Sequence, residues 1–140
     1  PGIVDIRFIL KDGSIPGETM IAEMEKHLQQ RSKRPLTDFV QVAAPDIVKY
    51  NTDFTYWINT SDNASAVQIQ EQVKQAVSDY QLWQSTGIGR DINPDELKAL
   101  LKKAGVKRAN IREPVFTVLQ DTEVAQVTST NIVYGGLEND

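Results

Sequence analysis

A regular alternation of apolar and polar residues over positions 48–58 constrains the fold of this 140-residue chain more than any other feature. One face of the expected strand carries β-branched and aromatic residues, namely Val48, Tyr50, Thr52, Phe54, Tyr56 and Ile58. The other face carries Lys49, Asn51, Asp53, Thr55 and Trp57. A period of two is typical of a strand with one buried face. Another layer of the fold must therefore cover that face.

Residues 65–85 have the clearest helical period in the chain and are the natural cover for the strand. Their apolar residues recur at intervals of three and four, at Ala66, Ile69, Val73, Ala76, Val77, Tyr80 and Trp83. Ser65 and Gln68 match a capping box at the start of this helix. An earlier helix is predicted over residues 17–31, followed by an extended connection at Pro35.

The remaining periodic segments predict further strands around these helices. The expected strands cover residues 3–10, 38–44, 106–111, 115–118 and 124–134, and Gly135-Gly136 closes the last one. Strands interleaved with three helices predict an α+β fold with antiparallel or mixed sheets and split βαβ, ferredoxin-like character. The short step at Pro45 leaves no room for a crossover, so the flanking strands cannot be a parallel pair. We expect one domain, with possible lobes at residues 1–46 and 47–140.

Two glycines one residue apart, Gly87 and Gly89, precede a further predicted helix and raise the question of a phosphate site. A dinucleotide fingerprint requires a third glycine where this chain has Ile92, and a phosphate loop requires Gly-Lys-Ser or Gly-Lys-Thr. Asp95 and Glu96 also stand where a bound phosphate would need positive potential. The segment therefore does not predict an anion site.

The same segment is well explained as the start of a helix. Asn93 can cap it, Pro94 suits the first helical position, and Glu96 can complete a capping box. Gly105 can take the left-handed conformation that ends the helix. Its expected buried stripe is Leu97, Leu100, Leu101 and Ala104.

Composition excludes several classes of site. The chain has no Cys and one His, which rules out disulfides, thiolate metal sites and a histidine cluster. Its net charge of -4 disfavours nucleic-acid binding. No apolar run approaches the roughly 20 residues that span a bilayer, so we expect no membrane contact and take the cytoplasm as the default origin. We accordingly assign no catalytic, cofactor-binding or metal-binding residue.

The remaining candidates have simple structural interpretations. His27 is expected on a helix surface, and Asp12-Gly13-Ser14 is expected to be a turn and not a calcium loop. The basic run of Arg31, Lys33 and Arg34 is a weak hint of an interface. The aromatic residues of the central strand could stack on bases, but core packing is favoured. The carboxylate pairs at 95–96 and 23–25 identify no acid-base site.

Four stretches of the chain resemble one known family. They are PGIVDIRFILKDGSIP, RPLTDFVQVAAPDIVKYNTDFTYWI, GIGRDINPDELKALLKKAGVKRANI and STNIVYGGLE. In order and spacing they are similar to the baseplate J-like family of contractile-tail phages, with related components in prophage tails and contractile injection particles.

This resemblance implies a structural function without catalysis or a cofactor. It implies the C-terminal portion of a longer baseplate wedge protein, which agrees with the absence of an initiating Met. The implied partners are other wedge and tail proteins in a multi-subunit ring around the tail hub. The implied location is the tail baseplate of the virion, after assembly in the bacterial host cytoplasm.

Two other classes of function stay open from the sequence. A small-molecule-binding regulatory α+β domain would show ligand-dependent thermal stabilisation. A nucleic-acid module would show binding that weakens steeply with salt.

Overall fold

The long alternating segment is the central strand of the larger of the two sheets that the described residues form. The computed structural model describes residues 2–31 and 38–140. Strand β3 covers Asp46–Asn59, and from Tyr50 onward its side chains alternate between buried and half-buried. The buried face consists of Tyr50, Thr52, Phe54, Tyr56 and Ile58, as the pattern predicts.

Strands β4 (Arg108–Glu113) and β5 (Glu123–Glu138) flank β3 on its two sides. β4 is antiparallel to β3, whereas β5 is parallel to it. In this register Phe54 stands between Ile111 and Ile132. The parallel pair is possible because the chain between β3 and β5 is long enough to cross over the sheet.

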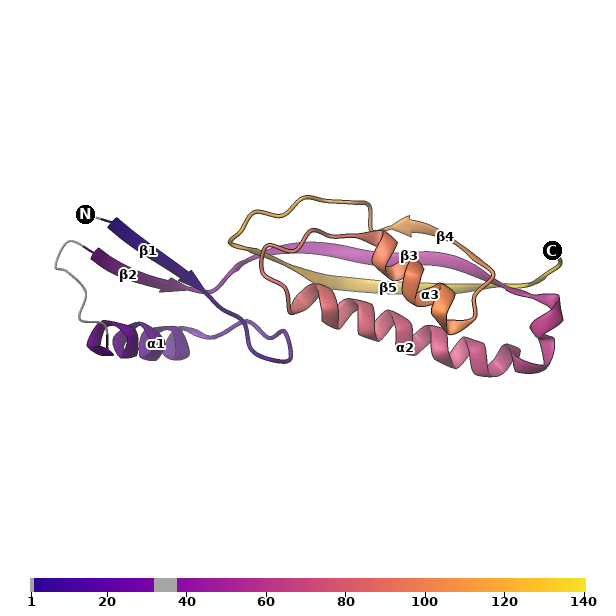
Figure 1. Ribbon diagram of the computed structural model, residues 1–140, viewed down its shortest axis with the longest axis horizontal. Coiled ribbons are helices and arrows are strands. Elements are labelled where there is room, and N and C mark those ends of the chain that lie inside the picture. The colour runs from indigo at the N-terminus through magenta and orange to yellow at the C-terminus, as the bar shows by residue number, and fades with distance from the viewer. Residues whose placement is uncertain (1, 32–37) are drawn as a thin grey trace.

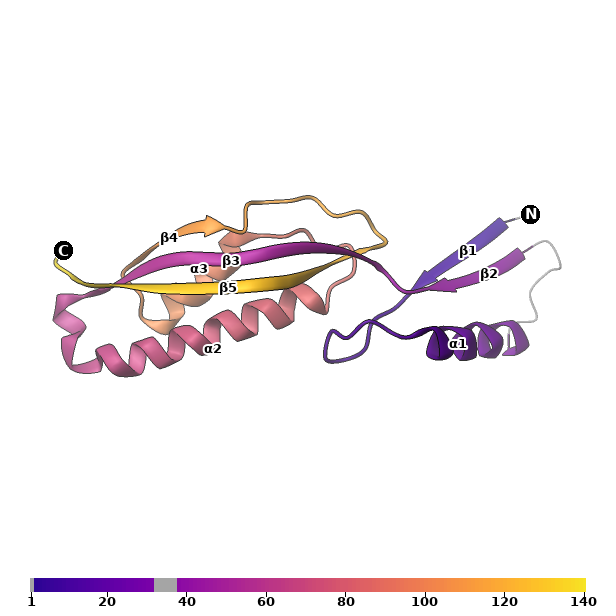
Figure 2. The ribbon, with the colours of Figure 1, turned by 180° about the vertical axis from the view of Figure 1, so that it is seen from behind.

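Helices α2 (Ala66–Ser85) and α3 (Pro94–Ala104) lie on the same side of this sheet (Figure 1). Figure 2, seen from behind, shows the strands in front of α3, so the opposite sheet face is open. The predicted helix over 65–85 is confirmed. The helices contribute Ile69, Val73, Ala76, Val77, Tyr80, Leu97 and Leu101 to the core.

The capping box expected at Ser65 does not form. A 3-10 helix, η1 (Thr60–Ser65), runs directly into α2, and the Ser65 backbone has φ -103° and ψ 5°. Ser65 makes no side-chain capping bond because its backbone is not extended there. Asn59 instead caps η1, accepting a hydrogen bond from the Ser61 N–H at 3.1 Å.

The second sheet contains β1 (Gly2–Arg7) and β2 (Asp38–Ala43), paired in parallel from Gly2↔Asp38 to Arg7↔Ala43. Helix α1 (Glu18–Arg31) lies in the crossover between them. The predicted connection at Pro35, together with Lys33 and Arg34 of the basic run, lies outside the described residues.

The α+β fold class is confirmed, with three α-helices among the described residues, and the larger sheet is mixed as expected. The split βαβ detail is wrong, because β1 and β2 are direct neighbours, as are β3 and β5. β2 and β3 are not a parallel pair, and they belong to different sheets. The two-residue step at Pro45 carries the chain from one sheet to the other.

Two predicted strand ends and one predicted strand need correction. β1 ends at Arg7 and not at residue 10, because Leu10 enters a turn in which its carbonyl accepts the Gly13 N–H at 2.9 Å. The expected strand at 115–118 is absent, since Pro114 has no N–H for a ladder and the segment makes a single bridge, Thr117 with Ile92. β5 continues past Gly135-Gly136, where a register shift accommodates the glycines.

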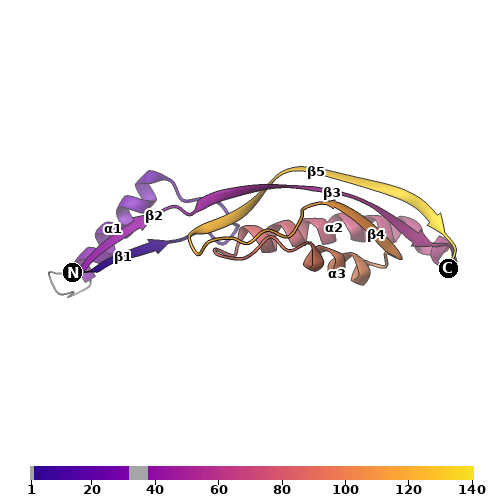
Figure 3. The same ribbon diagram turned by 90° about the horizontal axis from the view of Figure 1, so that it is seen from above.

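The molecule is elongated. Figure 3 shows the N-terminal sheet with α1 at one end and the C-terminus at the other. No helix in the described part of the chain is long and apolar enough to cross a membrane.

Candidate interaction surfaces

The glycine-rich loop before α3 is occupied by internal contacts. The Gly89 N–H donates to the Glu123 carbonyl at 2.7 Å, and its φ of 76° is left-handed. Arg90 stacks on Trp83, with its guanidinium carbon 4.4 Å from the ring centroid, and donates to the Trp83 carbonyl. The loop thus connects the end of α2 to the start of β5, in agreement with its interpretation as a helix boundary.

The start of α3 confirms part of the predicted capping. Asn93 Oδ1 accepts the Asp95 N–H at 3.0 Å, with Pro94 next to the cap and Gly105 left-handed at the far end. The expected box with Glu96 is wrong, because the Asn93 N–H donates to Gln84 Oε1 at 2.9 Å.

Gln84 is a buried polar residue that the sequence did not single out. It is fully buried and also accepts a hydrogen bond from the Tyr80 hydroxyl at 2.9 Å. Its Nε2 donates to the Asp91 carbonyl at 3.1 Å. The spacing of four residues between Tyr80 and Gln84 could have predicted its burial, because residues at that spacing lie on the same face of a helix.

The aromatic residues of β3 belong to the core, as predicted. Tyr50 and Tyr80 meet edge to face with ring centroids 6.2 Å apart. The Tyr50 hydroxyl is buried without a hydrogen-bond partner, and burial raises its pKa far above the usual range. Phe54 and Tyr56 are likewise buried, so these rings present no stacking surface.

A network of side-chain hydrogen bonds crosses the open face of the larger sheet. Arg112 on β4 makes two hydrogen bonds to Asp53, at 2.7 and 3.2 Å, and a third to Thr55. Asn131 on β5 donates to Asp53 Oδ1 at 3.0 Å. The hydrogen bond from Arg112 holds the pKa of the Asp53 carboxyl below its usual value. This face is therefore polar but largely satisfied by its own contacts.

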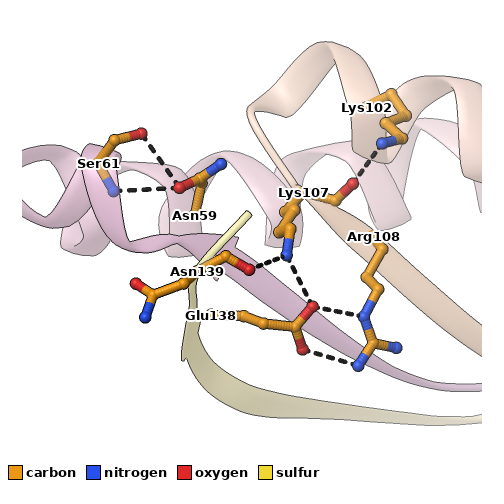
Figure 4. A network of polar contacts seen from close by, with 7 residues as sticks. All are labelled: Asn59, Ser61, Lys102, Lys107, Arg108, Glu138 and Asn139. Atoms are coloured by element: carbon orange, nitrogen blue, oxygen red, sulfur yellow. Dashed lines mark hydrogen bonds and ion pairs between the residues drawn. The ribbon is translucent and has the colours of Figure 1, made fainter.

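A second polar cluster links the end of β5 to the start of β4 across β3 (Figure 4). Glu138 accepts two hydrogen bonds from Arg108, at 2.7 and 2.8 Å, and one from Lys107 at 2.8 Å. Lys107 also donates to the Asn139 carbonyl at 2.6 Å. The hydrogen bonds from Arg108, and to a smaller extent the one from Lys107, lower the pKa of Glu138 to about 2. The cluster therefore favours the ionised form of Glu138.

The outer edge of β5 is open. Within the described residues β5 pairs only with β3, so no strand lies along its other edge after Glu123, whose carbonyl accepts the Gly89 N–H. Residues 124–137 contain neither a charged residue nor proline. Thr128, Ser129, Thr130 and Asn131 are all exposed. A register shift at Thr128 allows Thr128 and Ser129 both to donate to Asn51 Oδ1, at 2.6 and 2.8 Å. A long, uncharged edge of this kind is a surface to which another chain can add a strand.

The loop between β4 and β5 exposes a short apolar patch. Val115, Phe116 and Val118 are 67%, 58% and 66% exposed. Exposed apolar residues gathered in this way are typical of protein contact sites.

The other residues considered from the sequence do not converge on one site. His27 is exposed on α1, and Asp12-Gly13-Ser14 is a turn in which the Ser14 N–H donates to Asp12 Oδ1 at 2.9 Å. Asp95 and Glu96 lie in the first turn of α3, whereas Glu23 and Glu25 lie on α1. Over the described ranges, no group of three or more His, Asp or Glu residues could hold a metal ion.

These observations define an α+β module whose sheet edge and loop surface are free to contact other molecules. Two family models match the chain in succession: the baseplate J-like central domain over residues 1–44, and the baseplate J-like protein C-terminal domain over residues 52–133. The chain belongs to the baseplate J-like family, as its sequence resemblance indicated. A search of curated proteins gave no match. Membership indicates a structural role in a phage tail baseplate.

Proposed function

We propose that this chain takes part in assembling the wedge of a contractile-tail baseplate through protein-protein contacts. The observation that carries the proposal is the succession of the two baseplate J-like domain models along the chain. Its partners are other wedge and tail proteins in a multi-subunit ring, in a phage, a prophage or a related contractile injection system. Assembly takes place in the bacterial host cytoplasm.

The free edge of β5 is the surface best suited to such contacts. Its unpaired backbone groups can bind any extended segment, and a contact made by backbone hydrogen bonds does not require a matching set of charges. The apolar patch at Val115, Phe116 and Val118 adds a second area of contact. The apolar patch lies outside the internally satisfied polar clusters, whereas Asn131 on β5 also binds Asp53.

The proposal treats the chain as a scaffold without catalysis, cofactor or metal. The buried Gln84 supports this interpretation, because it holds the α2–α3 connection together through the Asp91 carbonyl and the Asn93 N–H. Gln84 makes hydrogen bonds with three residues of this chain, Tyr80, Asp91 and Asn93.

We further propose that the chain divides into the two lobes expected from the sequence, residues 1–46 and 47–140. The two separate sheets and the boundary between the two family models support this division. Each lobe would then present its own surfaces to the assembly.

Co-expression with the neighbouring tail proteins tests the proposed function. A baseplate component should co-purify with at least one of them, and the complex should persist on size-exclusion chromatography. Repeating the purification over a range of salt concentrations separates apolar and backbone contacts from ionic ones. Absence of a complex at every salt concentration would contradict the proposal.

A further inference from the structure

The turn between β1 and α1 reaches across to the larger sheet. Gly13 is buried there, and its carbonyl accepts a hydrogen bond from Gln126 Nε2 on β5 at 3.4 Å. Residues 12–14 share a cavity of about 380 Å³ with the last turns of α2, including Gln81 and Ser85. The turn therefore lies against the junction of α2 and β5.

Glycine is required at the tip of this turn for two separate reasons. Its φ of 83° is in the left-handed region, which other residues rarely adopt. A Cβ at position 13 would also collide with Ser85 Oγ and lie 2.9 Å from Ser85 Cβ. The close approach of this turn to α2 thus depends on the absence of a side chain.

The turn has a well-defined shape of its own. The Leu10 N–H donates to the Ser14 carbonyl at 3.0 Å, and the Gly13 N–H donates to the Leu10 carbonyl at 2.9 Å. Asp12 Oδ1 accepts the Ser14 N–H. Because local bonds fix the turn, its position against α2 also fixes the start of α1.

A second contact lies beside the short connection between the two sheets. Arg7 Nη1 donates to the Ala44 carbonyl at 3.0 Å and lies 3.8 Å from Asp46 Oδ2 at the start of β3. Only Ala44 and Pro45 separate β2 from β3. A connection of this length holds the sheets together but does not by itself set the angle between them.

We propose that the Gly13 turn is a latch that fixes the orientation of the N-terminal sheet relative to the C-terminal sheet. When the turn is seated against Ser85 and Gln126, the two sheets move as one body. When it leaves, they swing about the connection at 44–45, as in a hinge between domains. The contact is small, so the latch is reversible. This inference concerns the conformation of the chain and does not depend on its partners.

The absence of cysteine makes the latch directly measurable. Spin labels on two introduced cysteines, Glu23→Cys on α1 and Lys98→Cys on α3, report the distance between the two parts of the chain. Both positions are exposed. In the otherwise unchanged chain we expect one narrow distance distribution.

Gly13→Ala should unseat the latch. We expect the ratio of molecules whose turn has left α2 to molecules whose turn contacts α2 to rise by at least about fivefold. A rise of this size corresponds to roughly 1 kcal/mol. Gln126→Ala, which removes only the hydrogen-bond donor, should broaden the distribution to a smaller extent. This second variant keeps the test valid if Gly13→Ala impairs folding.

Two glycines provide matched controls. Gly136 also has a left-handed φ, 102°, but a Cβ there would meet nothing within 4 Å. Gly17 has neither the φ nor a close neighbour. Gly136→Ala and Gly17→Ala should therefore leave the distribution narrow. A broad distribution before any change, or one that stays narrow in both Gly13→Ala and Gln126→Ala, would overturn the latch.

Discussion

The guanidinium carbon of Arg108 lies 3.6 Å from the centroid of the Trp57 ring, which covers the backbone of β5 at Gly135. This stack explains why an apolar residue occupies the polar face of β3. The Trp57 ring lies between the Arg108 guanidinium and the backbone at Gly135. Only glycine fits there, because a Cβ on residue 135 would be 2.6 Å from Trp57 Cε2. The three strands are thereby joined on their open face.

Gly135→Ala should destabilise the chain by about 1 to 3 kcal/mol, because the added methyl group overpacks the Trp57 contact. The same change in a Trp57→Ala background should cost clearly less. A double-mutant cycle measured by urea unfolding isolates the coupling. Equal costs in the two backgrounds would show that the ring does not constrain Gly135.

Glu138 should make the stability of the chain depend on acid pH. Its folded-state pKa of about 2 is below the ordinary value of 4.5, so its stabilising effect is complete above pH 4.5. That effect is lost as the pH falls from about 4.5 toward 2. Unfolding midpoints measured between pH 7 and 2 should therefore fall less steeply in Glu138→Gln than in the unchanged chain.

Glu71 is the matched control for this measurement. It is an exposed glutamate on α2 that pairs with Lys74 at 3.2 Å, three residues along the helix. Exposed pairs of this kind contribute little. Glu71→Gln should leave the slope of the acid limb unchanged, and an equal effect of both substitutions would refute a specific role for Glu138.

Gln84 should be among the polar residues whose loss is most costly. Gln84→Ala removes three hydrogen bonds and leaves the Tyr80 hydroxyl and the Asn93 N–H without this partner, at a cost of about 3 kcal/mol. Chemical denaturation measures this loss, with the exposed Gln72→Ala expected within about 0.5 kcal/mol of the unchanged chain. A loss below about 1 kcal/mol for Gln84→Ala would show that water replaces its contacts.

Local periodicity was sufficient to predict the elements that carry most of the core. The alternation along β3 and the three-four spacing along α2 each identify a single buried face, and both faces are buried as expected. Strand neighbours were less predictable, because sheet order depends on where the crossover connections run and not on the strands themselves. The parallel pairing of β3 with β5 is a case in point.

The contacts that connect distant segments could not be predicted from spacing. Asn93 has an ordinary capping sequence after it, yet its N–H binds Gln84 from another helix and not the nearby Glu96. The Glu138 cluster joins residues 30 or more positions apart. Such side-chain pairings appear only when the fold brings the segments together.

The central claim is that this chain acts through its outer surface, and the edge of β5 gives the sharpest test. Val133→Lys adds a charge to that edge, and Val67→Lys adds the same charge to the exposed face of α2, where Val67 is 76% exposed. We propose measuring how much of each variant co-purifies with the neighbouring tail proteins. We expect a strong loss for Val133→Lys and wild-type recovery for Val67→Lys. Equal recovery of both variants would contradict it.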